Sequence, residues 1–207
     1  MNSRALLYIT KTNLKHNLLP HILIAILVAA LTPVFFGISS LNQTMAAQPL
    51  EIMVSLTGLI LLTPVFLPEQ NEAIRDVIRA RKVTYLKICI IRLLISVIIM
   101  LMINAAFVLI MKSADSDVTL MHFFAGTISG LFLGSLGFAA AGITDSVSAG
   151  YMLSLLYYMI NFSGKKHLGI FFLFSYSGSS FTEKYYLLGF SIFLIVFTLV
   201  FKYFKKK

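Results

Sequence analysis

The chain has 207 residues, of which 58% are hydrophobic and 12% are charged, and its mean hydropathy is +0.90. A soluble domain of this length rarely reaches such values, so we expect the chain to fold in a lipid bilayer. Lysine and arginine outnumber aspartate and glutamate by 17 to 8, but these charges fall in the gaps between apolar runs. This placement argues against nucleic-acid binding and leaves the bilayer, with its anionic lipids, as a partner.

The first seventeen residues are not a membrane span. Arg4, Tyr8, Lys11 and Lys15 recur at helical spacing, which predicts an amphipathic interfacial helix over residues 1–17. A basic tail that only sets the topology is an equal alternative. The apolar run that follows, Leu18 to Ile38, has 21 residues and exceeds the roughly 7–15 of a signal-peptide core, so we expect an uncleaved first span.

Six apolar runs are candidates for membrane-spanning helices, each of which needs about 20 residues. They are residues 18–38, 50–67, 88–111, 120–142, 147–162 and 185–201. The fifth has only 16 residues and is the weakest. Leu168 to Phe174 is too short to cross and is expected to form a re-entrant or extracellular helical piece between the last two spans. The sequence therefore predicts an all-α membrane protein with one transmembrane domain over residues 1–207.

The positions of lysine and arginine predict that both termini are cytoplasmic. With the N-terminus inside, the inner segments hold 13 of the 17 basic residues and the outer segments hold 4. An odd number of spans would place the C-terminal lysine cluster outside, so this bias favours six. A multi-pass protein of a cell membrane, in particular a bacterial plasma membrane, is expected.

Ionisable side chains at membrane depth are the usual indication of a proton relay or an intramembrane active site. We expect only His21, Arg92 and His122 at the ends of spans, where snorkelling to the interface explains them best. No pair of carboxylates, no metal-ligand spacing and no phosphate-binding loop is recognisable. The sequence therefore predicts no catalytic residue, no metal and no bound cofactor, and any ATP with its magnesium would be held by another chain.

The loop over residues 68–87 is the most informative segment. Pro68 and the acidic residues after it favour the start of a helix, and Ile74, Val77 and Ile78 form an apolar patch at i, i+3 and i+4. Side chains of both charges surround this patch. The pattern indicates a cytoplasmic docking helix, whereas a surface helix resting on lipid is the simpler alternative.

Together, the six spans, the N-terminal interfacial helix, the segment PEQNEAIRDVIRARKVTYLK and the short piece before the last span resemble the permease subunit of an ABC-2-type ABC transporter, the type V exporter family. The resemblance implies that this segment is the coupling helix that contacts a separate ATPase. The coupling residues would be Glu69, Glu72, Ile74, Arg75, Asp76, Val77, Ile78 and Arg79.

The resemblance also implies a partner set and a function. The partners would be ABC ATPase subunits and a second permease copy or a related permease, and the chain itself would not be an enzyme. With few charges at membrane depth, a hydrophobic or amphipathic substrate is expected, such as a lipid-like molecule or an antimicrobial peptide. The alternatives are the substrate-binding integral subunit of a vitamin-uptake transporter and an enzyme that processes lipid or peptide within the membrane.

Two further features concern packing and the outer end. Gly126, Gly130 and Gly134 form a small-residue stripe, for which we favour packing inside one subunit over a dimer contact. Phe171, Phe172 and Phe174 are candidates for an outer gate, and a filler that seals the bundle is the equal alternative. Tyrosines near the span ends, Tyr157, Tyr158, Tyr185, Tyr186 and Tyr203, are expected to be interface anchors.

Overall fold

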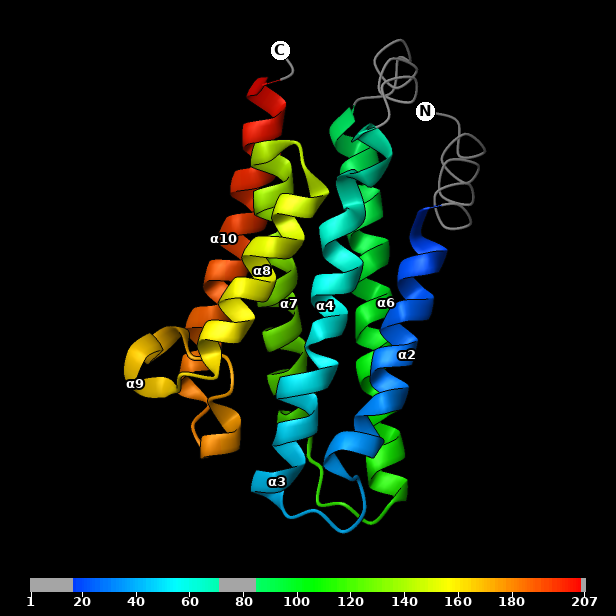
Figure 1. Cartoon of the computed structure of the whole chain (residues 1–207), viewed down its shortest axis with the longest axis vertical. Helices are drawn as coiled ribbons and strands as arrows, with labels where there is room; N and C mark the ends of the chain where they lie inside the picture. Colours follow the sequence, from blue (N-terminus) through cyan, green and yellow to red (C-terminus); the bar gives the residue numbers. More distant parts are fainter. Residues whose placement is uncertain (1–16, 71–84, 206–207) are drawn as a thin grey trace.

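The computed structural model describes residues 17–70 and 85–205, and within them the protein is all-α. Six helices run roughly side by side in one bundle (Figure 1). The single helices are α2 (Leu19–Phe36), α6 (Tyr85–Ser113), α7 (Leu120–Thr144), α8 (Val147–Asn161) and α10 (Thr182–Lys205). The remaining one is a composite helix made of α3 (Gln43–Gln48), η2 (Pro49–Val54), α4 (Leu56–Leu62) and η3 (Thr63–Gln70).

Five of the described helices are long and apolar enough to cross a membrane, and they correspond to α2, the composite helix, α6, α7 and α10. This supports a multi-pass membrane protein. Helix α8 has 15 residues and is therefore about 22 Å long, shorter than the hydrocarbon core of about 30 Å. The six expected helices are confirmed, and five of them have the length of a span, so a sixth crossing stays a prediction.

The limits of two helices differ from those expected. The composite helix begins at Gln43 rather than Leu50, because Asn42 caps it by accepting a hydrogen bond from the Met45 amide at 2.9 Å. Helix α10 begins at Thr182 rather than Tyr185, so Lys184 lies inside the helix and not in the loop before it. Both extensions add polar residues that hydropathy alone assigns to loops.

The ends of the helices show two distinct sides of the bundle. At the upper end in Figure 1, α2 begins, η3 ends, α6 begins and α10 ends. The loops after α2 and after α6 lie at the lower end. Ser116 joins these two loops, because its hydroxyl donates to the Ile38 carbonyl at 2.6 Å and accepts from the Leu41 amide at 3.1 Å.

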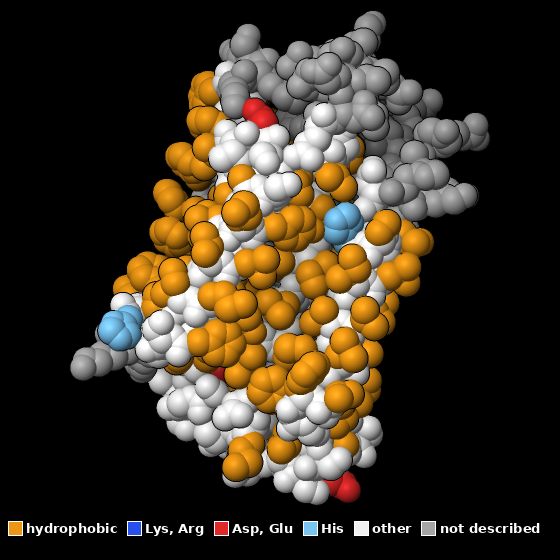
Figure 2. All heavy atoms as spheres, viewed as in Figure 1, with side chains coloured by type: hydrophobic (Ala, Val, Ile, Leu, Met, Phe, Trp, Pro, Cys, Tyr) orange, Lys and Arg blue, Asp and Glu red, His pale blue; other side chains and the backbone are white. Residues whose placement is uncertain are grey.

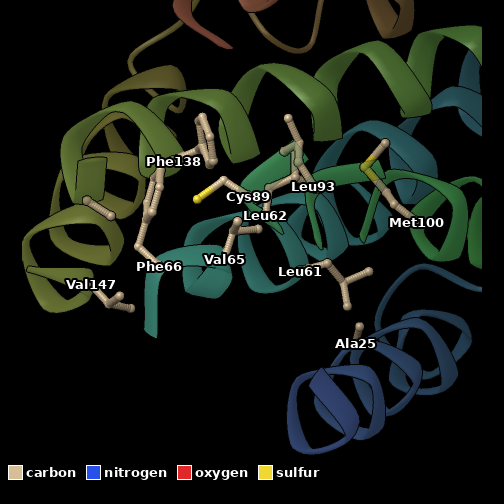
Figure 3. Close-up of a cluster of buried hydrophobic side chains, with 11 residues drawn as sticks. Ala25, Leu61, Leu62, Val65, Phe66, Cys89, Leu93, Met100, Phe138 and Val147 are labelled. Carbon is tan, nitrogen blue, oxygen red and sulfur yellow. The ribbon is translucent and has the colours of Figure 1, made fainter. Parts of the chain in front are cut away.

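In the middle of the bundle, both the buried side chains and the outward-facing side chains are mostly hydrophobic. Hydrophobic side chains are spread over the middle of the face shown in Figure 2. Figure 3 shows the largest interior cluster, in which Phe66 of η3 stacks on Phe138 of α7 with ring centroids 4.7 Å apart. Cys89 of α6 and Val147 of α8 pack in the same cluster. Since five helices meet there, this cluster holds the upper half of the bundle together.

Glycines let the composite helix and α7 approach closely. A Cβ atom added to Gly58 would lie 1.9 Å from the Gly130 carbonyl oxygen, and one added to Gly134 would lie 2.6 Å from the Gly58 carbonyl oxygen. A Cβ on Gly126 would be 3.2 Å from Leu50. The expected stripe on α7 therefore packs against the composite helix of the same chain.

Candidate functional site

A fully buried ion pair links the composite helix to α10. The Lys184 ammonium lies 2.5 Å from Oε1 of Glu51, and neither side chain is exposed to solvent. Charged groups at membrane depth are costly and are the usual sign of function there. Glu51 lies eight residues after the start of the composite helix, which is about 12 Å along its axis.

Backbone amides complete the environment of the Glu51 carboxylate. Oε1 accepts a hydrogen bond from the Tyr176 amide at 3.0 Å, and Oε2 accepts one from the Ser177 amide at 2.8 Å. Both amides belong to the segment 162–181, which connects α8 to α10 and includes α9 (Lys165–Leu168), η4 (Gly169–Phe171) and η5 (Tyr176–Gly178). Glu51 therefore anchors this segment as well as α10.

The turn that carries Glu51 is a π-helix, η2, in which the Ser55 amide donates to the Leu50 carbonyl at 3.0 Å. Proline at position 49 has no amide proton for the preceding turn, and the Ser55 hydroxyl donates to the Glu51 carbonyl at 2.6 Å. Such π-turns are rare and recur at functional sites. The local sequence thus widens the composite helix at the turn where the Glu51 side chain is buried.

All three protons of the Lys184 ammonium have acceptors. Besides Glu51, the ammonium donates to the Ser129 hydroxyl at 2.5 Å and to the Leu173 carbonyl at 2.5 Å. An ammonium has three donors, so this environment satisfies it completely. We call Glu51, Ser129, Leu173 and Lys184 the latch, because they join four segments that are distant in sequence.

The chemistry of the latch fits a structural contact better than a catalytic one. Ser129 donates its proton to the Ala125 carbonyl at 2.9 Å or the Leu173 carbonyl at 3.2 Å, and its oxygen accepts from Lys184. A lysine paired with a carboxylate cannot accept a proton from this serine. The buried serine and lysine therefore lack the arrangement of an activated nucleophile and its base.

Asn161 and Tyr157 bind the segment 162–181 to α8, and Tyr158 binds α8 to the composite helix. The Asn161 side-chain oxygen accepts from the Leu173 amide at 2.7 Å, and the Tyr157 hydroxyl donates to the Phe171 carbonyl. The Tyr158 hydroxyl donates to the Ile52 carbonyl at 2.9 Å. Tyr157 and Tyr158 thus donate to backbone carbonyls of the protein, and their expected role as interface anchors stays a prediction.

The three phenylalanines proposed for the outer gate lie in the segment 162–181. Phe174 is buried, and its ring lies 5.8 Å from that of Tyr158. Phe171 contacts Phe190 of α10 with ring centroids 5.4 Å apart, and Phe172 contacts Phe174 at 5.9 Å. The aromatic rings fill the space between α8 and α10 beside the latch. The segment is irregular rather than a continuous helical piece, because only short 3-10 turns follow α9.

His122 and Arg92, which we expected to snorkel to the interface, are both buried. Nδ1 of His122 accepts from the Thr119 amide at 3.1 Å, so Nε2 carries the proton and donates to the Gln43 carbonyl at 2.8 Å. Arg92 donates to the Val65 carbonyl at 3.5 Å. The protein interior, and not the interface, solvates these two side chains, whereas the half-buried His21 contacts the Asn17 carbonyl at 2.9 Å near the start of α2.

A second ionic contact lies at the upper end. Lys202 of α10 pairs with Asp145, the left-handed residue of the turn between α7 and α8. The Lys202 ammonium also lies 5.0 Å from the centre of the Phe66 ring. Phe66 belongs to η3, which extends to Gln70 and so includes the first three residues of the predicted coupling segment 68–87. Contacts therefore run from η3 to both α7 and α10.

The predicted coupling residues lie almost entirely outside the described residues. Positions 72 to 79 belong to the undescribed range 71–84, and of Glu69 only the backbone, in η3, is described. The same applies to the interfacial helix predicted over residues 1–17, of which the structure describes only Asn17. Within the described residues, no group of three potential metal ligands comes together.

Sequence reasoning missed the latch. Glu51 lies at the start of the second predicted span, and the hydropathy pattern predicts an outer loop for Lys184. The missed signal was one acidic and one basic residue, each at the expected outer end of its span. Comparisons with protein-family models, with curated proteins and with solved structures gave no match for this chain.

Proposed function

We propose that this chain is the permease subunit of an ATP-driven exporter of the ABC-2 type, working with separate ATPase chains and a second permease. The observation that carries this proposal is the buried Glu51–Lys184 pair, which ties an irregular segment across the bundle away from the end at which η3 ends and α6 begins. A closed outer end and a docking segment at the other end are what an alternating-access permease needs. In this proposal both termini are cytoplasmic and α8 completes six crossings.

Helix α10 connects the two ends in the proposed mechanism. Its upper part contacts Phe66 through Lys202, and its lower part holds Glu51 through Lys184. These two lysines are 18 residues apart, which is about 27 Å along a helix. Closure of the ATPases on residues 71–84 would displace η3 and, through Phe66, shift α10 and open the latch.

The substrate would be hydrophobic or amphipathic, because the described membrane-depth charges are engaged with one another or with backbone groups. The vitamin-uptake alternative would require small-residue faces for the foreign ATPases. The stripe of Gly126, Gly130 and Gly134 is instead occupied by the composite helix of this chain. An intramembrane enzyme is disfavoured by the saturated environment of Ser129 and Lys184.

Two measurements test the proposal. The tagged chain, co-expressed with its neighbouring genes and purified in mild detergent, should retain an ATPase subunit. Arg79→Glu or Ile74→Asp should then abolish substrate-stimulated ATP hydrolysis without loss of the folded permease. Lys112→Glu, the same charge reversal on an exposed residue at the end of α6, is the control and should keep full coupled activity. A complex without any ATPase, or full coupling in both loop variants, would contradict the proposal.

A further inference from the structure

An apolar groove runs between α2 and α6, the two helices at the right edge of the bundle in Figure 1. Its volume is about 830 Å³, within the range of about 300–1,000 Å³ typical of small-molecule sites. All thirteen lining residues are apolar, and three of them are the alanines Ala29, Ala30 and Ala106. The single methyl groups of these alanines leave space between the helices.

The groove is straight and follows the helices. On α2 the lining residues run from Leu19 to Pro33, which is about 21 Å along the axis. On α6 they run from Ile99 to Ile110 at spacings of three and four residues, so they form one stripe. The groove therefore lies within the part of both helices that is long and apolar enough to span the membrane, parallel to the lipid chains.

The chemistry of the lining limits what can fill the groove. Water needs two to four polar partners, which an entirely apolar lining cannot provide. An empty groove of this size would forfeit the dispersion contacts of its walls. The occupant must therefore be apolar.

A second copy of the chain fits less well than a lipid. The surface inside the groove is far smaller than the roughly 800 Å² per partner that a stable protein interface buries, so a second copy would also have to cover the outer faces of α2 and α6. A flexible hydrocarbon chain needs no such area and can follow a groove between parallel helices. We infer that this groove binds a phospholipid acyl chain more strongly than the rest of the membrane-facing surface does, whether or not the protein is an exporter.

The absence of tryptophan from the chain allows a direct test with a single reporter. Met102→Trp places the reporter in the groove, and Leu109→Trp places it on the same helix outside the groove. The two parent residues are both 66% exposed, so they are matched controls. Each purified variant is titrated in detergent with a phosphatidylcholine that carries brominated acyl chains, which quench tryptophan on contact.

The tryptophan of Met102→Trp, in the groove, should lose fluorescence when lipid and protein are equimolar. The tryptophan of Leu109→Trp, outside the groove, should lose it only at a several-fold higher lipid-to-protein ratio. Filling the groove by Ala30→Phe or Ala106→Phe should remove this early phase, whereas Ala105→Phe, a half-buried position outside the groove, should retain it. Identical titrations of the two reporters would overturn the inference. So would a reporter signal that follows protein concentration instead of lipid, which would indicate a second copy in the groove.

Discussion

Replacing Lys184 by methionine should lower the free energy of unfolding by about 3–5 kcal/mol, because it leaves the Glu51 carboxylate buried without its counter-charge. Two backbone amides still donate to that carboxylate, which places the expected loss toward the lower end of the range. Glu51→Gln should also be destabilising, because it leaves the fully buried Lys184 ammonium without its counter-charge. These losses are large against the total stability of about 5–15 kcal/mol of a typical protein.

The double variant Glu51→Gln with Lys184→Met separates the charge effect from the hydrogen bonds. It removes both charges, and the glutamine oxygen can still accept from one of the two amides. We therefore expect the double variant to be more stable than Lys184→Met alone by about 1–2 kcal/mol. This is the opposite of what two independent losses would give.

Equilibrium unfolding in mixed detergent micelles with increasing sodium dodecyl sulfate measures these differences. Lys112→Met is the matched control, because Lys112 is exposed, and its loss should change stability by less than about 0.5 kcal/mol. Additive losses in the double variant would refute the coupling between Glu51 and Lys184. A Lys184→Met protein as stable as the parent would refute the burial of the pair.

Packing and hydrogen bonding lead to two further predictions. Gly58→Ala should destabilise the bundle by about 3 kcal/mol or more, because its Cβ would lie 1.9 Å from a backbone oxygen of α7. Gly189→Ala in α10 is the control, since its Cβ meets nothing within 4 Å and should be neutral or slightly stabilising in the same unfolding assay. Tyr158→Phe should cost about 1 kcal/mol by removing the bond to Ile52, whereas the exposed Tyr185→Phe should lie within about 0.5 kcal/mol of the parent. Equal effects of either variant and its control would contradict these assignments.

The helices were predictable from the sequence because lipid imposes a length and a composition on each of them. The expected span over residues 120–142 differs from α7 by only two residues at its end. Helix ends were less predictable where polar residues belong to a helix, as at Gln43 and Thr182. Hydropathy cannot recognise such turns, because their polar groups are solvated by the protein itself.

The latch could not be found from hydropathy for the same reason. Glu51 and Lys184 are each unfavourable in lipid when considered alone, and each becomes tolerable only through a partner 133 residues away in the sequence. Similarly, His122 appears free to reach the interface until Gln43 is placed against its ring nitrogen. Pairings of this kind depend on which helices are neighbours, and a single sequence does not show directly which helices lie side by side.

Stability and transport should respond differently to loss of the latch if the proposed function is right. The Glu51→Gln, Lys184→Met double variant keeps the hydrophobic packing around the segment 162–181, including Leu173 and Phe174, so this segment should stay near α10 while losing its ionic restraint. In a permease with its ATPases, an unrestrained outer end should favour the outward-open state without substrate and raise basal ATP hydrolysis. A purely structural ion pair would change the unfolding curve and leave basal hydrolysis as it was. Measuring the unfolding curve and basal ATP hydrolysis on the same preparation therefore distinguishes a latch that controls transport from an ion pair that only stabilises the fold.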